Sequence, residues 1–445
     1  MTVDLLLENA RAYIGGKMVD CCIAIDQGKI KKIGRKTTMP KSGSRINLKN
    51  MILLPGLIDV HVHLRDQKNA YKEDFYSGTA AAASGGITTV IDMPNNNPVT
   101  MSVKALQRRM ELARDKILVN VGFFSEFPND IQEIEKIVNA GAIAFKLYLA
   151  NQIGGLDIDC NSSLLEAFNA VKRCKVPVAV HAEDRSSLKR FENQLRQDGR
   201  NDINAFLLAH SEKVEEKAVE RVIALGDKTG VHVHLCHISA ATSLKRILSE
   251  KKKGATITCE TTPHNLLLSS EDLKRIGTKA LTVPPVREKH HAQALLNGMN
   301  DGWIDILASD HAPHTLQEKE GNSVWGIKAG VPGLETMLPL MLTEVNRGRL
   351  SIRDLVRLMA EKPAQIFSLK NKGYLVEGGS ADLTVIDLTR KFKINAAEFH
   401  SKSKHSPFNG LLVKGKPVKT FVGGQLVFDE GQVTGKTGTG EIVRK

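Results

Sequence analysis

The sequence contains little cysteine, few aromatic residues and no long apolar segment. Only six of its 445 residues are cysteines and none forms a Cys-x-x-Cys pair, which excludes a disulfide scaffold and is typical of a reduced, cytoplasmic protein. Apolar runs such as Met51–Leu54 end far short of the ~20 residues that a membrane-spanning helix needs. The N-terminus lacks the basic and apolar pattern of a signal peptide, so we expect no membrane partner.

Acidic residues are outnumbered by basic ones, and the formal net charge is +13. Aromatic residues make up only 5% of the chain and the lysines are spread along its whole length, so we do not expect a nucleic-acid partner. Excess positive charge instead favours solubility and attracts small anionic substrates. An apolar fraction of 42% and a charged fraction of 25% are typical of a globular protein with a large core.

The chain changes character twice. Residues 1–54 and 368–445 contain short strand patterns, whereas residues 55–367 alternate short apolar runs with longer amphipathic stretches. This alternation predicts an α/β fold, a (β/α)8 TIM barrel, because strands separated by helices form a closed parallel sheet. The predicted barrel strands are Leu57–Val62, Thr88–Met93, Leu118–Phe123, Ala142–Leu149, Val176–Val180, Val231–His237, Thr256–Cys259 and Ile304–Ala308.

The terminal segments are each too small to bury a core alone, so we expect them to form one small β-sandwich together. The domains are therefore predicted as 1–54 and 368–445 for the two parts of the sandwich and 55–367 for the barrel. The polar stretches 193–204 and 315–323 are expected to form loops near a functional site.

The strongest local signal is the pair His61 and His63 at the end of a predicted strand. Side chains two residues apart leave a strand on the same face, so both imidazoles can bind one metal ion. The pair alone is weak evidence, because paired histidines also occur in ordinary cores. Further ligand-type residues lie near the ends of other predicted strands, which meet at one mouth of a barrel and suggest a two-metal hydrolase site. These residues are Lys146, His181, His237 and Asp310.

Lys146 is the unusual member, because an ammonium group has no lone pair to donate to a metal. Apolar neighbours such as Phe145 and Leu147 predict burial, and burial beside positive charge lowers the pKa of a lysine. A neutral amine reacts with carbon dioxide to give a carbamate, an anion whose two oxygens can bridge two metals. The alternative is a surface lysine whose stem lies along apolar neighbours.

Five motifs together resemble the cyclic amidohydrolase family, which includes dihydroorotases, allantoinases and the hydantoinase and dihydropyrimidinase group. The resemblance covers nearly the whole chain. The motifs are His61-Val-His63, Phe145-Lys146-Leu-Tyr148, Val180-His181-Ala-Glu183, Leu235-Cys-His237 and Ser309-Asp310-His-Ala-Pro-His314.

This resemblance implies a binuclear zinc centre, with two Zn²⁺ per subunit bridged by an N6-carboxylated Lys146. Asp310 is implied to be catalytic as well as a ligand. The remaining ligands would be divided between the two ions, with His61, His63 and Asp310 on the first zinc and His181 and His237 on the second.

Within the family, the segments Asp310–Lys319 and Pro332–Pro339 are most similar to those of dihydroorotases. The resemblance implies the reversible cyclisation of N-carbamoyl-L-aspartate to L-dihydroorotate in pyrimidine biosynthesis, with Asp310 moving the proton. Another cyclic-amide hydrolase, allantoinase or dihydropyrimidinase, is the alternative. A catalytically inactive assembly partner is a third interpretation, but such a protein would be expected to have lost ligands.

Dihydroorotate carries a carboxylate that hydantoin and dihydrouracil lack. Arg65 lies two residues beyond a ligand histidine, and its guanidinium can hold a carboxylate through two parallel hydrogen bonds. A surface salt bridge is the alternative role for Arg65, and a turn residue is the alternative for Asn95. The expected substrate-binding residues are His63, Arg65, Asn95, His314, Ala329 and Gly330.

Some positions depart from the family pattern. The loop 150–155 differs from the loop expected of the animal dihydroorotases, and Val283 stands where many bacterial relatives carry a substrate-binding asparagine. A third metal site could use His61 with Cys236, Glu260 and His314, although we favour a buried, apolar role for the cysteine. The resemblance alone implies a homodimer and an association with aspartate carbamoyltransferase.

Overall fold

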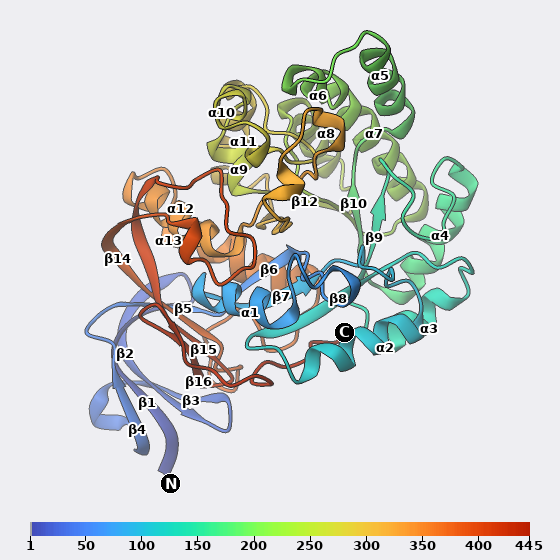
Figure 1. Ribbon diagram of the computed structural model, residues 1–445. Coiled ribbons are helices and arrows are strands. Elements are labelled where there is room, and N and C mark those ends of the chain that lie inside the picture. Colours follow the sequence, from blue (N-terminus) through green and yellow to red (C-terminus); the bar gives the residue numbers. More distant parts are fainter. Residues whose placement is uncertain (1) are drawn as a thin grey trace.

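The computed structural model describes residues 2–445, and its central element is an eight-stranded parallel sheet (Figure 1). The strands follow one another in chain order around this sheet. A parallel bridge between Val62 and His311 joins its two edges, and the His63 amide donates to the His311 carbonyl at 2.9 Å. The predicted TIM barrel is therefore confirmed. Its strands are β6 Leu57–Val62, β7 Ile87–Asp92, β8 Asn120–Glu126, β9 Ala144–Tyr148, β10 Val178–His181, β11 Val233–Leu235, β12 Ile257–Thr261 and β13 Ile306–Leu307.

Helices surround the barrel, and several of them bury one apolar stripe against it. In α2, for example, Leu106, Met110 and Ala113 are buried at helical spacing, and the Ser102 hydroxyl accepts from the Ala105 amide as an N-cap. The helices are α1 Phe75–Ser84, α2 Val103–Arg114, α3 Glu133–Asn139, α4 Asn161–Cys174, α5 Arg185–Gln197, α6 Ile203–Ala209, α7 Glu212–Thr229, α8 Ala241–Lys252, α9 Pro263–Leu267, α10 Ser270–Ile276, α11 Lys289–Asn300, α12 Leu334–Asn346, α13 Ile352–Val356 and α14 Lys362–Ile366.

The prediction of a loop over residues 193–204 is wrong at both ends. Helix α5 continues to Gln197 and α6 begins at Ile203. Only Leu188 of α5 is buried, so the helix is largely polar and lacks the wide apolar stripe by which helices are usually found. The residue that indicates the start of this helix is the N-cap Asp184, whose carboxylate accepts from the Ser187 amide.

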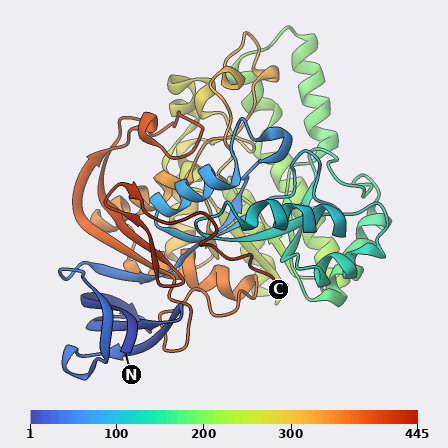
Figure 2. The ribbon, with the colours of Figure 1, turned by 60° about the horizontal axis from the view of Figure 1, so that its bottom comes forward.

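Both ends of the chain contribute to a second, mixed sheet of nine strands (Figure 2). The short strand β5 joins the two parts, because it pairs with β1 on one side and with β14 on the other. One core includes Leu7 and Ile23 from the first part and Leu383 and Phe421 from the second. The strands are β1 Thr2–Ile14, β2 Lys17–Asp26, β3 Lys29–Gly34, β4 Lys41–Asn47, β5 Ile52–Pro55, β14 Leu383–Lys393, β15 Leu412–Val422, β16 Gln425–Asp429 and β17 Gln432–Val433.

The last residues of the chain leave this sheet and bind the barrel at the start of β8. The Val121 amide donates to the Glu441 carbonyl at 2.9 Å, and the Val443 amide donates to the Val121 carbonyl at 2.9 Å. The tail therefore covers the end of the barrel at which the strands begin. Within residues 2–445, no helix is both long and apolar enough to cross a bilayer.

We predict that Gly440→Ala lowers the free energy of unfolding by about 1–3 kcal/mol, because the added methyl group overpacks this contact. A Cβ atom at Gly440 would lie 2.1 Å from the Val119 carbonyl oxygen. Urea unfolding of the whole protein measures the effect. Gly326→Ala is the matched control, since its Cβ would meet no atom within 4 Å. Equal stability of both variants would contradict the docking of the tail.

Candidate metal centre

Six polar side chains converge at the mouth of the barrel where its strands end. His61 lies in β6, Lys146 in β9 and His181 at the end of β10. His237 follows β11 by two residues and Asp310 follows β13 by three. All five are buried, as is His63. The structure thus brings together the six residues that the sequence predicts as ligands of the two zinc ions.

The first group consists of His61, His63 and Asp310. The Nε2 atoms of the two histidines lie 3.4 Å and 3.3 Å from the same Asp310 carboxylate oxygen. Each residue offers one ligand atom, and these three atoms lie within 4.8 Å of one another. Two imidazoles and one carboxylate are a ligand set that suits zinc.

The second group consists of His181 and His237. The His181 Nδ1 and His237 Nε2 atoms face each other at 3.1 Å. The ring of His237 also lies 5.2 Å from the ring of His61, so the two groups are adjacent. Their arrangement fits two neighbouring cations.

Three of the four imidazoles have their other ring nitrogen held by a protein oxygen. His61 Nδ1 contacts the Glu260 carboxylate, His63 Nδ1 contacts the Asn95 amide oxygen at 2.7 Å, and His181 Nε2 contacts the Glu183 carboxylate at 2.8 Å. Such contacts fix the tautomer and the ring orientation of a metal-binding histidine. They leave His61 Nε2, His63 Nε2 and His181 Nδ1 to face the centre.

Burial keeps two of the four imidazoles, those of His63 and His237, in the neutral form that binds metal. It lowers the pKa of His63 to about 3 and lowers the pKa of His237 well below its usual value, so both rings are neutral near pH 7. Burial alone raises the pKa of Asp310, but His61 and His63 outweigh this effect and hold that pKa well below its ordinary value. Asp310 is therefore an anion beside the neutral ring of His63.

Lys146 is completely buried, which excludes the alternative of a surface lysine. Its amine donates to the Cys236 thiol at 3.0 Å and lies 5.1 Å from the centroid of the Tyr148 ring. A buried lysine without a carboxylate partner is rare in proteins and needs a physical reason.

Beside the metal ligands lies a cavity of about 260 Å³. Arg65, Asn95, Ala329 and Gly330 line it, as expected of substrate-binding residues, and so does Val283. His314 is not among its lining residues. Its Nε2 atom instead contacts the Ala329 carbonyl at 3.1 Å, and its Nδ1 atom lies 3.3 Å from the Lys72 amine. His314 thus touches the backbone of the cavity wall from behind.

Arg65 is buried in this wall, and its Nε atom has no hydrogen-bond partner. Within residues 2–445 its guanidinium forms no ion pair, whereas the neighbouring Arg109 binds the Asp92 carboxylate and the Arg65 carbonyl. Arg65 also has a φ of 54°, a backbone conformation that a non-glycine residue rarely adopts. A buried, unpaired cation held in this way is suited to binding an anion.

Several cavity residues were not predicted from the sequence. Tyr148, Ala150, Asn151 and Ile153 line the cavity, although only the loop 150–155 was noted as a departure from the family pattern. Tyr148 follows Lys146 by two residues and leaves β9 on the same face, a signal that could have identified it.

The predicted third metal site is assembled only in part. Ligand atoms of His61, Cys236 and Glu260 lie within 4.8 Å of one another, but His314 contacts Ala329 and Lys72 instead. Burial raises the pKa of the Cys236 thiol to about 12, so it remains protonated. A protonated, buried thiol agrees with the apolar role that we favour for this cysteine.

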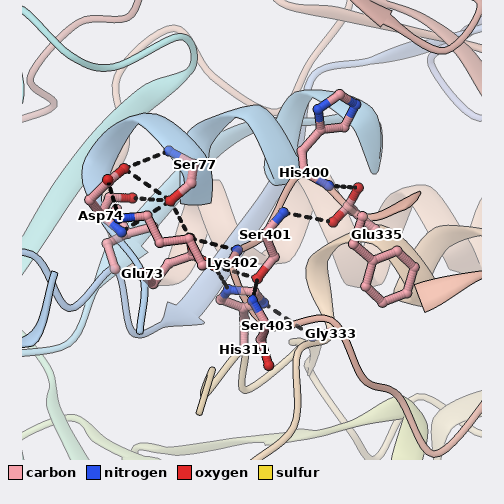
Figure 3. Close-up of polar contacts among 12 residues, drawn as sticks. Glu73, Asp74, Ser77, His311, Gly333, Glu335, His400, Ser401, Lys402 and Ser403 are labelled. Carbon is pink, nitrogen blue, oxygen red and sulfur yellow. Dashed lines mark hydrogen bonds and ion pairs between the residues drawn. The ribbon is translucent and has the colours of Figure 1, made fainter. Parts of the chain in front are cut away.

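A polar network connects His311, the residue after Asp310, to the C-terminal part of the chain (Figure 3). His311 accepts from the Gly333 amide through Nδ1 and contacts Glu73 through Nε2 at 3.2 Å. The completely buried Glu73 carboxylate also accepts from the hydroxyls of Ser77 and Ser401. The segment between β14 and β15 is thereby fixed against the strand end that carries Asp310.

Comparison with known proteins identifies the class. The model of the amidohydrolase family matches residues 52–427, and the chain belongs to this family of hydrolases, whose members are typically metal-dependent.

Its relatives include proteins with two different activities. A dihydroorotase of Methanothermobacter thermautotrophicus is 37% identical over 434 residues, covering 97% of this chain and 95% of the relative. An L-hydantoinase of Paenarthrobacter aurescens is 33% identical over 450 residues, covering 99% and 98%. A solved structure of the L-hydantoinase (dihydropyrimidinase) from Arthrobacter aurescens superposes with a TM-score of 0.96 at 32% identity, covering all of both chains.

We predict that Glu73→Gln lowers the free energy of unfolding by about 1–3 kcal/mol, because the buried network around His311 loses its charged acceptor. Guanidinium unfolding at pH 7 measures this change. Glu271→Gln is the control, since Glu271 is exposed and pairs only with Lys274 on the surface of α10. If Glu73→Gln lost no more stability than Glu271→Gln, the network around His311 would not contribute to the stability of the fold.

Proposed function

We propose that this amidohydrolase is a dihydroorotase of pyrimidine biosynthesis, which interconverts N-carbamoyl-L-aspartate and L-dihydroorotate with loss or gain of water. The observation that carries the proposal is the buried, unpaired guanidinium of Arg65 in the wall of the cavity, beside the candidate metal ligands. Dihydroorotate offers a ring amide to the centre and a carboxylate to this guanidinium. The dihydroorotase relative at 37% identity supports the same activity.

The residues at the mouth fit two zinc ions. His61, His63 and Asp310 would hold one, and His181 and His237 would hold the other. A carbamate on Lys146 would bridge them, since its amine is completely buried and forms no ion pair with a carboxylate within residues 2–445. Zinc when bound supplies Lewis-acid polarisation and lowers the pKa of water.

Asp310 is the residue that we propose moves the proton. During hydrolysis its carboxylate takes a proton from the attacking water and gives it to the ring nitrogen that leaves. The same atoms act in the opposite order when the ring closes. Arg65 and Asn95 orient the substrate carboxylate, while the backbone at Ala329 and Gly330 borders the ring.

Hydrolysis of another ring amide is the second candidate, because the L-hydantoinase structure superposes over the whole chain. The two functions make different demands on Arg65, since hydantoin and dihydrouracil have no carboxylate to pair with it. Parallel assays with dihydroorotate, dihydrouracil, hydantoin and allantoin separate them. We expect the highest kcat/KM with dihydroorotate, and a higher value with any other ring would contradict the proposal.

The remaining expectations stay predictions. We propose the division into residues 1–54, 55–367 and 368–445, with residues 1–54 and 368–445 sharing the mixed sheet through β5 and β14. A homodimer, an association with aspartate carbamoyltransferase and a cytoplasmic location are likewise proposed from the family resemblance.

We predict that Arg65→Met lowers kcat/KM for dihydroorotate by about 30-fold or more, since loss of a buried ionic contact costs ~2 kcal/mol or more. The rate with dihydrouracil is expected to change far less, because that ring makes no ionic contact with Arg65. Steady-state kinetics on both substrates measures the difference. Arg108→Met, on the exposed surface of α2, is the control. An equal loss of kcat/KM with both substrates would show that Arg65 does not bind the carboxylate of dihydroorotate.

We predict that Asp310→Asn lowers kcat by about 100-fold or more, the usual contribution of a positioned general acid–base group. The amide keeps the size of the side chain but cannot carry the proton. Metal content, measured on the same sample by mass spectrometry, separates this effect from loss of a ligand. Activity within a few-fold of the native enzyme with metal still bound would contradict the assigned role.

A further inference from the structure

Lys319 is the second completely buried lysine in residues 2–445, and it lies outside the candidate metal centre. Its side-chain amine donates to three backbone carbonyl oxygens, those of Leu281 at 3.0 Å, Lys328 at 3.0 Å and Gly330 at 2.9 Å. Within the described residues it forms no ion pair. All three donors of an ammonium group are therefore used by main-chain oxygens.

This arrangement makes the free energy of folding less favourable, because an ammonium group loses its hydration when it is buried. Burial lowers the pKa of Lys319 to about 7. The three carbonyl oxygens oppose this lowering of the pKa, because they favour the charged amine, which alone has three N–H groups to donate. A methionine of similar length would fill the same space without the desolvation of a charge. The presence of lysine thus points to a task that an apolar side chain could not perform.

The three carbonyl groups belong to backbone that borders the cavity. Gly330 lines the cavity, Ala329 lies between two of the bound carbonyls, and Val283 follows Leu281 by two residues. The Gly330 amide donates to the Leu281 carbonyl at 2.8 Å, so Lys319 and Gly330 share this acceptor. The amine is thus the point at which two separate segments of the wall are joined.

Position 330 has no room for a side chain that could hold this part of the wall. Gly330 has a φ of 138°, and a Cβ atom there would lie 2.6 Å from the Ala312 carbonyl oxygen. No side chain at position 330 can therefore anchor the segment from within. The segment is held instead through its own carbonyl groups, by the Lys319 amine at Lys328 and Gly330 and by the His314 ring at Ala329.

We propose that Lys319 is a positioning residue that fixes the backbone wall formed by Val283, Ala329 and Gly330 and thereby sets substrate affinity. The proposal rests on the proposed function, because it takes the wall to border the ring of the substrate. Lys319 touches neither the cavity nor the metal ligands, so its loss should move the wall without removing a ligand or the proton carrier. Binding should weaken while the chemical step is largely kept.

The test compares Lys319→Met, Lys319→Gln and Lys251→Met in the full-length, metal-loaded enzyme. Methionine removes every donor, whereas glutamine keeps two N–H groups and should restore part of the function. Lys251 is the control, because its amine also binds a backbone carbonyl, that of Trp303 at 2.8 Å, together with the Asp305 carboxylate, and because it does not line the cavity. We measure kcat and KM for dihydroorotate, metal content, and hydrogen exchange of the segment 328–332.

For Lys319→Met we expect KM to rise about tenfold or more with kcat within about threefold, at unchanged metal content. The Gly330 amide should exchange faster, because its acceptor is no longer fixed. Lys319→Gln should lie between this variant and the native enzyme, and Lys251→Met should leave KM and the exchange of this segment unchanged.

Two results would overturn the proposal. One is unchanged exchange of 328–332 in both Lys319 variants, and the other is faster exchange without a rise in KM. If Lys319→Met does not fold, the same two criteria apply to Lys319→Gln. A native enzyme that does not hydrolyse dihydroorotate contradicts the proposed function instead. In that case KM is taken with the ring amide that the native enzyme does hydrolyse, and the exchange comparison decides whether Lys319 holds the wall.

Discussion

Four imidazoles can be buried together at one end of this barrel because protein oxygens hold the ring nitrogens that face away from the centre. Glu260, Asn95 and Glu183 each bind one of them, which fixes three rings and turns a free nitrogen of each toward the centre. The parallel barrel makes this possible, since its strands end at one mouth and place residues from distant parts of the sequence within a few ångströms. Without these partners, the rings of His61, His63 and His181 would lack defined tautomers and orientations.

Much of this arrangement could be predicted from the sequence. Buried parallel strands consist of nearly continuous apolar residues, so polar residues at their ends are conspicuous, and His61, Lys146 and His181 were found in this way. His314 was placed in the cavity by resemblance, but its ring turns to the Ala329 carbonyl, because rotation about a side chain is set by tertiary packing. The network of Glu73 and Ser401 joins residues 328 positions apart, a contact that no local pattern indicates.

Metal binding and the choice between ring substrates involve different parts of the proposed site. The candidate metal ligands and Asp310 would serve either of the two proposed activities, and hydantoinase and dihydroorotase relatives occur at similar identity. On the proposed function, discrimination between rings comes from the cavity wall, which Arg65 and the backbone at Gly330 line. The ligands were recognisable because metal binding restricts residue type. The wall was harder to predict, because backbone groups can be supplied by almost any residue.

The most direct test of the account is a diffraction experiment at the zinc absorption edge on crystals of the active protein, with activity followed as metal is removed and restored. The account predicts two anomalous peaks per chain, one among His61, His63 and Asp310 and one between His181 and His237. It also predicts that activity disappears with these peaks and returns with them. Full activity in metal-free protein, or metal bound away from these side chains, would contradict it.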